Sequence, residues 1–162
     1  LLASPLRPVQ IIIGKVFPYV FIAFTNACII LLIGNVVFGV PVAGSIGLLL
    51  LENLLYILMA LSLGILISSI TNSQQIAMML SLVALMLPTI LLSGFIFPIE
   101  NMPWIMQVLC AIMPPKYFII IIKGIMLKGN GIAYLWKETL ILAGFTVIFI
   151  TLSVKKFKKR LA

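Results

Sequence analysis

Three glutamates are the only carboxylates in this 162-residue sequence, and their spacing argues against acid–base catalysis. Glu52, Glu100 and Glu138 lie far apart, and no helical repeat pairs them. The chain has no histidine, which removes the commonest general base and metal ligand. Its two cysteines, Cys28 and Cys110, are interpreted as small apolar fillers rather than as a disulfide framework. We therefore predict no catalytic residue, no metal site and no cofactor bound by this chain.

The pair Gly14-Lys15 is the only feature that suggests phosphate binding. A Walker A loop would need glycine at position 9 and serine or threonine at position 16. Val9 and Val16 stand there instead. Nucleotide binding by this route is excluded.

Composition indicates an integral membrane protein. Hydrophobic residues make up 64% of the chain and charged residues 9%, and the mean hydropathy is +1.33. A soluble domain is nearer half apolar and a quarter charged. Between Lys15 and Glu100 the only charged side chain is Glu52. Because the sequence begins with Leu1 and no signal peptide pattern precedes the first apolar run, we interpret it as a piece of a longer protein.

The predicted fold is all-α, with four transmembrane helices. A spanning helix needs about 20 mostly apolar residues. Four segments qualify: about 16–38, 46–70, 76–97 and 132–154. Pro88 predicts a kink in the third. These spans give a membrane domain over 16–154, preceded by a cytoplasmic segment, 1–15, and followed by a basic tail, 155–162.

The segment 98–131 is predicted to be a re-entrant or interfacial helical hairpin before the last span. Pro98, Pro103, Pro114 and Pro115 divide it. The pieces between these prolines are about 10–12 residues long, too short to cross roughly 30 Å of hydrocarbon at about 1.5 Å per residue. Irregular backbone at that depth must be covered by protein.

The positive charges predict the orientation of the spans. Seven of the 11 lysines and arginines lie near the two ends of the chain and four lie on the opposite side of the predicted spans. The positive-inside rule puts both ends in the cytoplasm. The C-terminal basic cluster is interpreted as a stop-transfer signal, with recruitment of anionic lipid as the alternative.

Polar and small residues within the spans suggest packing and a possible pathway. Asn26 could line a path, although a hydrogen bond to a neighbouring helix is favoured. Glu52 is expected at the outer interface, with a substrate or partner contact as the second interpretation. Ala60, Gly64 and Ser68 recur every four residues and predict a close helix-packing seam, either within the chain or between subunits.

Prolines also mark the entry to the first span. Pro5 disfavours helical geometry at Ser4, so a preceding helix would end at about Leu2–Ala3. Pro8 can then take the first position of the next helix, where its missing N–H is not needed. Leu1–Arg7 is thus expected to be an elbow at the membrane surface.

Four stretches resemble the C-terminal part of the membrane subunits of type-2 ABC transporters, the exporter permeases of bacteria. The resemblance covers almost the whole chain, and the third stretch is the most specific. The stretches are Leu1-Leu-Ala-Ser-Pro-Leu-Arg-Pro8 with Gly14-Lys15; Gly64-Ile-Leu-Ile-Ser-Ser69 with Ser73-Gln-Gln75; Leu92-Ser-Gly-Phe-Ile-Phe-Pro-Ile-Glu-Asn-Met-Pro103; and Pro114 leading to Tyr117-Phe118 and Lys123-Gly124.

The resemblance implies a subunit of six spans in the bacterial inner membrane that works as a homo- or heterodimer with separate ABC ATPase subunits. Those partners would bind ATP and magnesium. No nucleic-acid partner is implied. The elbow would be the end of a coupling helix that contacts the ATPase, and an outer gate would include the re-entrant region. The expected contact residues are Leu1, Leu2, Ala3, Ser4, Pro5, Leu6 and Arg7; the expected gate residues are Ser93, Gly94, Phe95, Pro98, Glu100, Pro103, Pro114 and Tyr117.

Other functions stay open from the sequence alone. An ion-coupled carrier or channel usually has ionisable groups at mid-membrane, and this chain offers at most Glu52. A membrane enzyme or a scaffold is the third hypothesis. The scarcity of charge in the spans mildly favours a lipophilic cargo, but drugs, lipid-linked glycans, peptides and lipids all remain candidates.

Overall fold

The computed structural model describes the backbone of residues 8–71, 73–94 and 98–161, and the side chains of these except 8–13, 15, 84, 85, 88 and 156–161. Within these ranges the regular structure is entirely helical. The predicted all-α membrane fold is confirmed. Residues 1–7 and Phe95, which include the predicted elbow and one predicted gate residue, lie outside the described residues.

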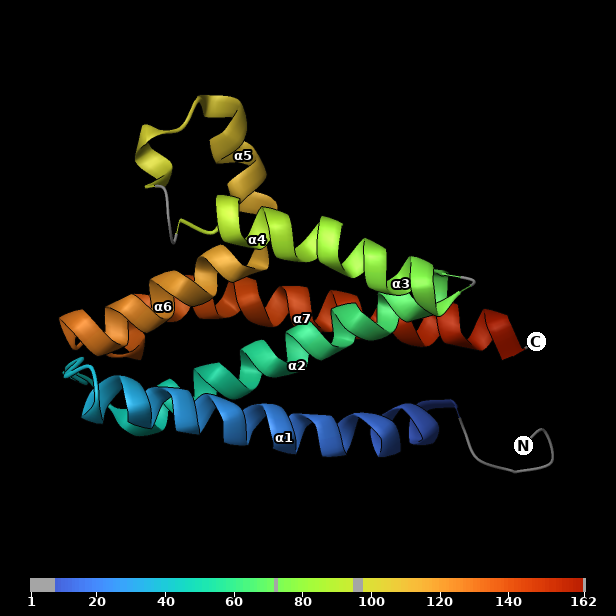
Figure 1. Ribbon diagram of the computed structural model, residues 1–162, viewed down its shortest axis with the longest axis horizontal. Helices are drawn as coiled ribbons and strands as arrows, with labels where there is room; N and C mark the ends of the chain where they lie inside the picture. The colour runs from blue at the N-terminus through green and yellow to red at the C-terminus, as the bar shows by residue number, and fades with distance from the viewer. Residues whose placement is uncertain (1–7, 72, 95–97, 162) are drawn as a thin grey trace.

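Three long helices account for three of the predicted spans. They are α1 (Pro8–Val36), α2 (Ile46–Ile70) and α7 (Ile132–Leu161). Their apolar parts, Val16–Val36, Ile46–Ile70 and Ile132–Lys155, are each long enough to cross a membrane. Helix α1 is described from Pro8 onward, and the predicted elbow before it stays a prediction. The start of α1 and the end of α7 lie at the same end of the molecule (Figure 1).

The third predicted span is helical but divided. It consists of α3 (Gln74–Ser81), the π-helical turn η1 (Leu82–Met86) and α4 (Leu87–Leu92), with helical backbone throughout. The amide of Leu87 bonds to the carbonyl of Leu82. Pro88 has no N–H to donate, and the helix beside it widens into a π-helical turn. The irregularity predicted at Pro88 takes this form. Each piece is short, so none is long enough by itself to cross a membrane.

The proline-divided region forms two short helices, as predicted. After a 3₁₀ turn, η2 (Ile99–Asn101), come α5 (Trp104–Ile112) and α6 (Pro114–Lys128). The axes of α5 and α6 are bent by 85°, as in a broken span or a re-entrant loop. Gly129, at φ +65°, ends α6 in the left-handed conformation that favours glycine. The chain then enters α7, so α6 and α7 form a hairpin (Figure 1).

The predicted basic tail is helical over most of its length. The last helix, α7, continues through the basic cluster to Leu161. Lysine and arginine are good helix formers and interact favourably with a helix C-terminus, so the basic cluster prolongs the last helix.

The core lies where α2 meets α6 and α7. Its fully buried members include Leu49, Met59, Ile121, Ile125 and Leu142. Beside them, the rings of Tyr56 and Phe118 stack with centroids 3.9 Å apart. The helix α1 packs at the side of this core and leaves large apolar side chains such as Phe17 and Phe21 exposed. An apolar outer surface of this kind suits lipid or further membrane helices.

Candidate functional site

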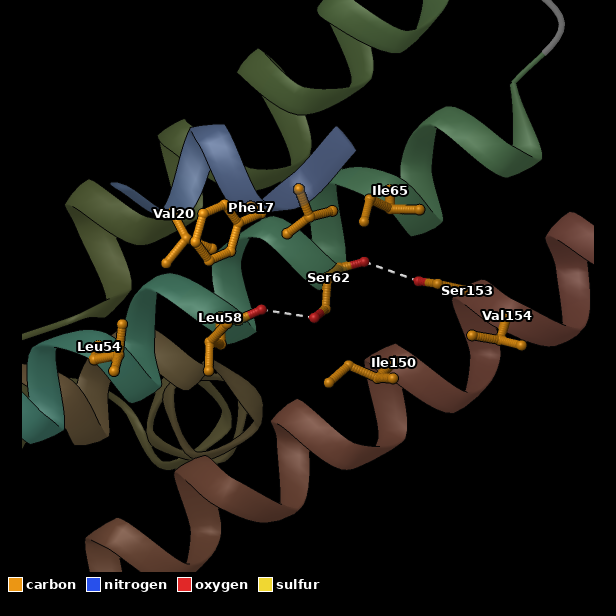
Figure 2. A pocket seen from close by; sticks show the side chains of 10 residues that line it. Phe17, Val20, Leu54, Leu58, Ser62, Ile65, Ile150, Ser153 and Val154 are labelled. Atoms are coloured by element: carbon orange, nitrogen blue, oxygen red, sulfur yellow. Dashed lines mark hydrogen bonds between the residues drawn. The ribbon is translucent and has the colours of Figure 1, made fainter. Parts of the chain in front are cut away.

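A cavity of about 470 Å³ lies between α1, α2 and α7. Its lining, seen in Figure 2, comes from three helices that are distant in sequence. The lining residues are Val16, Phe17 and Val20 from α1; Leu54, Leu58, Ser62 and Ile65 from α2; and Ile150, Ser153 and Val154 from α7. Eight of these ten residues are wholly apolar, so the cavity can receive hydrocarbon or aromatic groups.

The two hydroxyl groups in the lining are already hydrogen-bonded. Ser62 Oγ donates to the carbonyl of Leu58 at 2.6 Å, and Ser153 Oγ donates to the carbonyl of Ser62 at 2.9 Å (Figure 2). Each hydroxyl has one proton, and each proton is used on backbone. A ligand here would meet no free hydrogen-bond donor from these serines, which favours apolar over polar groups.

Glu52 is buried where α2 packs against α7. Its side chain is 1% exposed. Its Oε1 lies 2.7 Å from Oγ1 of Thr139 on α7, while its Oε2 has no hydrogen-bond partner among the described groups. The predicted depth of Glu52, at the outer membrane interface, stays a prediction. This contact could not be predicted from the sequence pattern, because its partner stands 87 residues away.

The small-residue repeat on α2 has no close packing partner at Gly64, its central member, within the described chain. Ala60, Gly64 and Ser68 are exposed on the helix. A Cβ built on Gly64 would meet no atom within 4 Å. A packing seam around Gly64 would therefore involve another segment or another subunit. The seam stays a prediction.

Two other glycines lie close to a neighbouring helix. A Cβ on Gly44 would come within 2.6 Å of the carbonyl oxygen of Ile125, and a Cβ on Gly124 within 3.0 Å of Leu135. Sequence reasoning missed both, since neither belongs to a small-residue repeat. The only sequence signal for a close approach was the position of each glycine: Gly44 lies in the turn before α2, and Gly124 lies in a segment that prolines delimit.

The predicted outer-gate residues gather around the start of the broken helix pair. Ser93 is buried, and Gly94 adopts φ +78° with its Cα facing the Ile99 side chain. Pro98 and Pro103 precede η2 and α5. Glu100 is exposed. A second cavity of about 420 Å³ lies here between α4 and α5, lined by Leu91, Leu92, Pro98, Asn101, Met102, Pro103 and Met106.

Tyr117 links α5 to α6 across the bend. Its hydroxyl donates to the carbonyl of Ala111 at 2.7 Å, and Lys116 lies 5.8 Å from its ring centroid. Pro114 occupies the first turn of α6 and is buried. These contacts stabilise the bend between α5 and α6, which lies within the predicted gate region.

Asn26 is separate from both cavities. It lies on α1 and is exposed, and it lines neither of the two cavities described above. Its predicted role in a pathway, or in a bond to a neighbouring helix, stays a prediction. No group of three histidine, cysteine, aspartate or glutamate side chains that could hold a metal ion occurs among the residues whose placement is described.

A model of a protein family described as "ABC-2 family transporter protein" matches residues 1–155. The chain is similar to the "Probable multidrug ABC transporter permease YbhS" of Escherichia coli, with 35% identity over 161 residues that cover 99% of this chain and 43% of the relative. It is 40% identical over 138 residues to the "Probable multidrug ABC transporter permease YbhR" of the same organism, covering 85% of this chain and 37% of the relative.

More distant relatives include the "ABC transporter G family member 20" of Dictyostelium discoideum, 28% identical over 156 residues that cover 95% of this chain and 21% of the relative. The chain thus spans less than half the length of these curated relatives. No solved structure matches it.

Proposed function

The chain belongs to the ABC-2 transporter family, and from this premise we propose that it forms the C-terminal part of the membrane-spanning permease of an ATP-driven exporter. The observation that carries the proposal is the family match over residues 1–155, which takes in every described helix except the last six residues of α7. The broken pair α5–α6 before the last span supports it, because the resemblance implied re-entrant helices at that point. In this proposal two permease subunits form the translocation path in a bacterial inner membrane.

The energy source in this proposal is a separate ATPase subunit. ATP and magnesium bind to that partner, and Leu1–Arg7 transmits its movement to α1. The start of α1 and the end of α7 share one end of the molecule, which agrees with a cytoplasmic position for both. Movement at that end would alter the spacing of α1 from α2 and α7.

The apolar cavity supports a lipophilic cargo. Its wall is formed by α1 together with α2 and α7, so a shift of α1 would open or close it. Two of the relatives carry "multidrug" in their names. We propose that the apolar part of the cargo contacts this wall during transport.

An ion-coupled carrier is the second candidate, and the buried Glu52 is the observation that favours it. Ionisable side chains within membrane helices commonly belong to ion pathways or proton relays. This alternative predicts transport driven by a proton or sodium gradient without ATP, and loss of that transport in Glu52→Gln.

One experiment distinguishes the ATP-driven exporter from the ion-coupled carrier. The full-length permease that contains this chain is purified with its candidate ATPase and reconstituted in proteoliposomes with a lipophilic fluorescent cargo. ATP-dependent movement that is lost on Arg7→Glu supports the exporter. If the ATPase does not co-purify, Arg7→Glu leaves transport unchanged and an ion gradient alone drives it, the exporter proposal is wrong.

A further inference from the structure

The carboxyl group of Glu52 has an incomplete set of hydrogen bonds in the interface between α2 and α7. The side chain is 1% exposed. Oε1 contacts Thr139 Oγ1 at 2.7 Å, whereas Oε2 is inaccessible and has no partner among the described protein groups. Burying an ionised carboxylate with so few bonds is strongly unfavourable.

A count of protons distinguishes two arrangements of this contact. Thr139 Oγ1 also lies 3.0 Å from the carbonyl oxygen of Leu135, one turn earlier in α7. The hydroxyl has one proton and can donate it to only one of these two oxygens. If it donates to Glu52, an ionised carboxylate is left with a single bond. If Glu52 carries a proton, Glu52 donates to Thr139 and Thr139 donates to Leu135, so both short contacts become hydrogen bonds.

Among the described side chains, no lysine or arginine bonds to Glu52, because Oε1 contacts Thr139 and Oε2 has no partner. On α7, Lys137 lies 5.9 Å from the Trp136 ring, and on α6, Lys116 lies 5.8 Å from the Tyr117 ring. The remaining titratable side chains described on the helices packed against this region are Tyr56 on α2, Glu138, Tyr134 and Lys155 on α7, Tyr117, Lys123 and Lys128 on α6, and Tyr19 and Cys28 on α1. Of these, Glu138 also has a buried Oε2 without a hydrogen-bond partner.

Both features favour a neutral carboxyl group. We propose that Glu52 is a proton-binding site of the α2–α7 interface, at which the carboxylic acid donates to Thr139 Oγ1. The ligand is a proton, and the site lies outside the two apolar cavities. Any movement that parts α2 from α7 would expose the acid to water and allow it to release the proton. Protonation of Glu52 and the packing of these two helices are then linked, whichever energy source drives transport.

Infrared spectroscopy tests the protonation directly. The full-length permease containing this chain is placed in lipid nanodiscs at neutral pH, and the spectra of wild type, Glu52→Gln and Glu100→Gln are compared. We expect the carbonyl stretching band of a protonated carboxylic acid in wild type, its loss in Glu52→Gln and its retention in Glu100→Gln, because Glu100 is exposed. If Glu52→Gln loses only carboxylate intensity, the proposal is wrong.

Thr139→Val gives a second measurement that needs no change at Glu52. Valine keeps the shape of threonine but removes the acceptor hydroxyl, so the acid band should shift as its hydrogen bond is lost. An unchanged band would contradict the proposed bond. Glutamine is neutral and can also donate to Thr139, so Glu52→Gln should melt within about 2 °C of wild type and Glu52→Ala clearly lower. Equal losses in these two variants would also contradict the proposal.

Discussion

Gly44, in the connection between α1 and α2, lies against the backbone of Ile125 in α6 so closely that a Cβ would come within 2.6 Å of its carbonyl oxygen. The preceding residue, Ala43, donates its backbone N–H to the carbonyl of Met126 at 3.0 Å. The connection between α1 and α2 is thereby hydrogen-bonded to the end of α6. These backbone contacts fix the position of α6 relative to α1 and α2 at this end of the molecule.

Gly44→Ala should destabilise the permease by about 1–3 kcal/mol, because a backbone carbonyl cannot move aside as a flexible side chain can. The expected readout is a Tm lowered by several degrees in thermal unfolding of the full-length protein. Gly34→Ala is the matched control, since a Cβ there meets nothing within 4 Å. If both variants melt together, the close approach of Gly44 to Ile125 is wrong.

Ser153→Ala should have a smaller effect. Its hydroxyl joins α7 to the carbonyl of Ser62 on α2, and interhelical hydrogen bonds in membrane proteins average about 0.6 kcal/mol. We expect Tm to fall by about 1–3 °C. Thr151→Val is the control, because the exposed Thr151 hydroxyl bonds only to Val147 in its own helix. A loss no larger than that of the control would show that the α2–α7 bond does not contribute to stability.

Segment lengths and proline positions predicted much of this fold. The apolar runs gave α1, α2 and α7 because about 20 apolar residues must cross the bilayer as helix. The prolines gave the division into α5 and α6, because Pro103 and Pro114 can begin a helix but cannot continue one. The π turn beside Pro88 was predicted only as a kink, since a missing N–H does not specify how the helix adjusts.

The pairing of faces could not be predicted. In α2 almost every side is apolar, so the pattern does not mark which face meets another helix. The helix turns Glu52 toward Thr139, and a Cβ on Gly64, at the centre of the small-residue repeat, would meet no described atom within 4 Å. Both outcomes depend on how α7, some 70 residues later, lies across α2. Only the assembled bundle contains that information.

Val20→Phe should reduce binding of an apolar probe to the cavity between α1, α2 and α7. The larger ring would occupy part of the about 470 Å³ that Val20 helps to line. We expect weaker binding of a lipophilic fluorescent probe by the full-length permease, with Tm changed little. Val36→Phe, on the same helix at a position 71% exposed, is the control for added aromatic surface. Equal probe affinity in both variants would mean that the cavity does not bind the probe.

Tyr117→Phe should loosen the bend between α5 and α6 while keeping the ring in place. The Tyr117 hydroxyl donates to Ala111 across the 85° bend, and its ring centroid lies 6.4 Å from that of Phe145 on α7. Removing a hydrogen bond of about 0.5–1.5 kcal/mol should speed amide hydrogen exchange in Trp104–Ile112 by about 2- to 10-fold, without a similar change in α7. Tyr134→Phe, at a side chain 78% exposed, is the matched control. Exchange in α5 that stays at the wild-type rate would mean that Pro114 and the packing of α6 hold the bend without the hydroxyl.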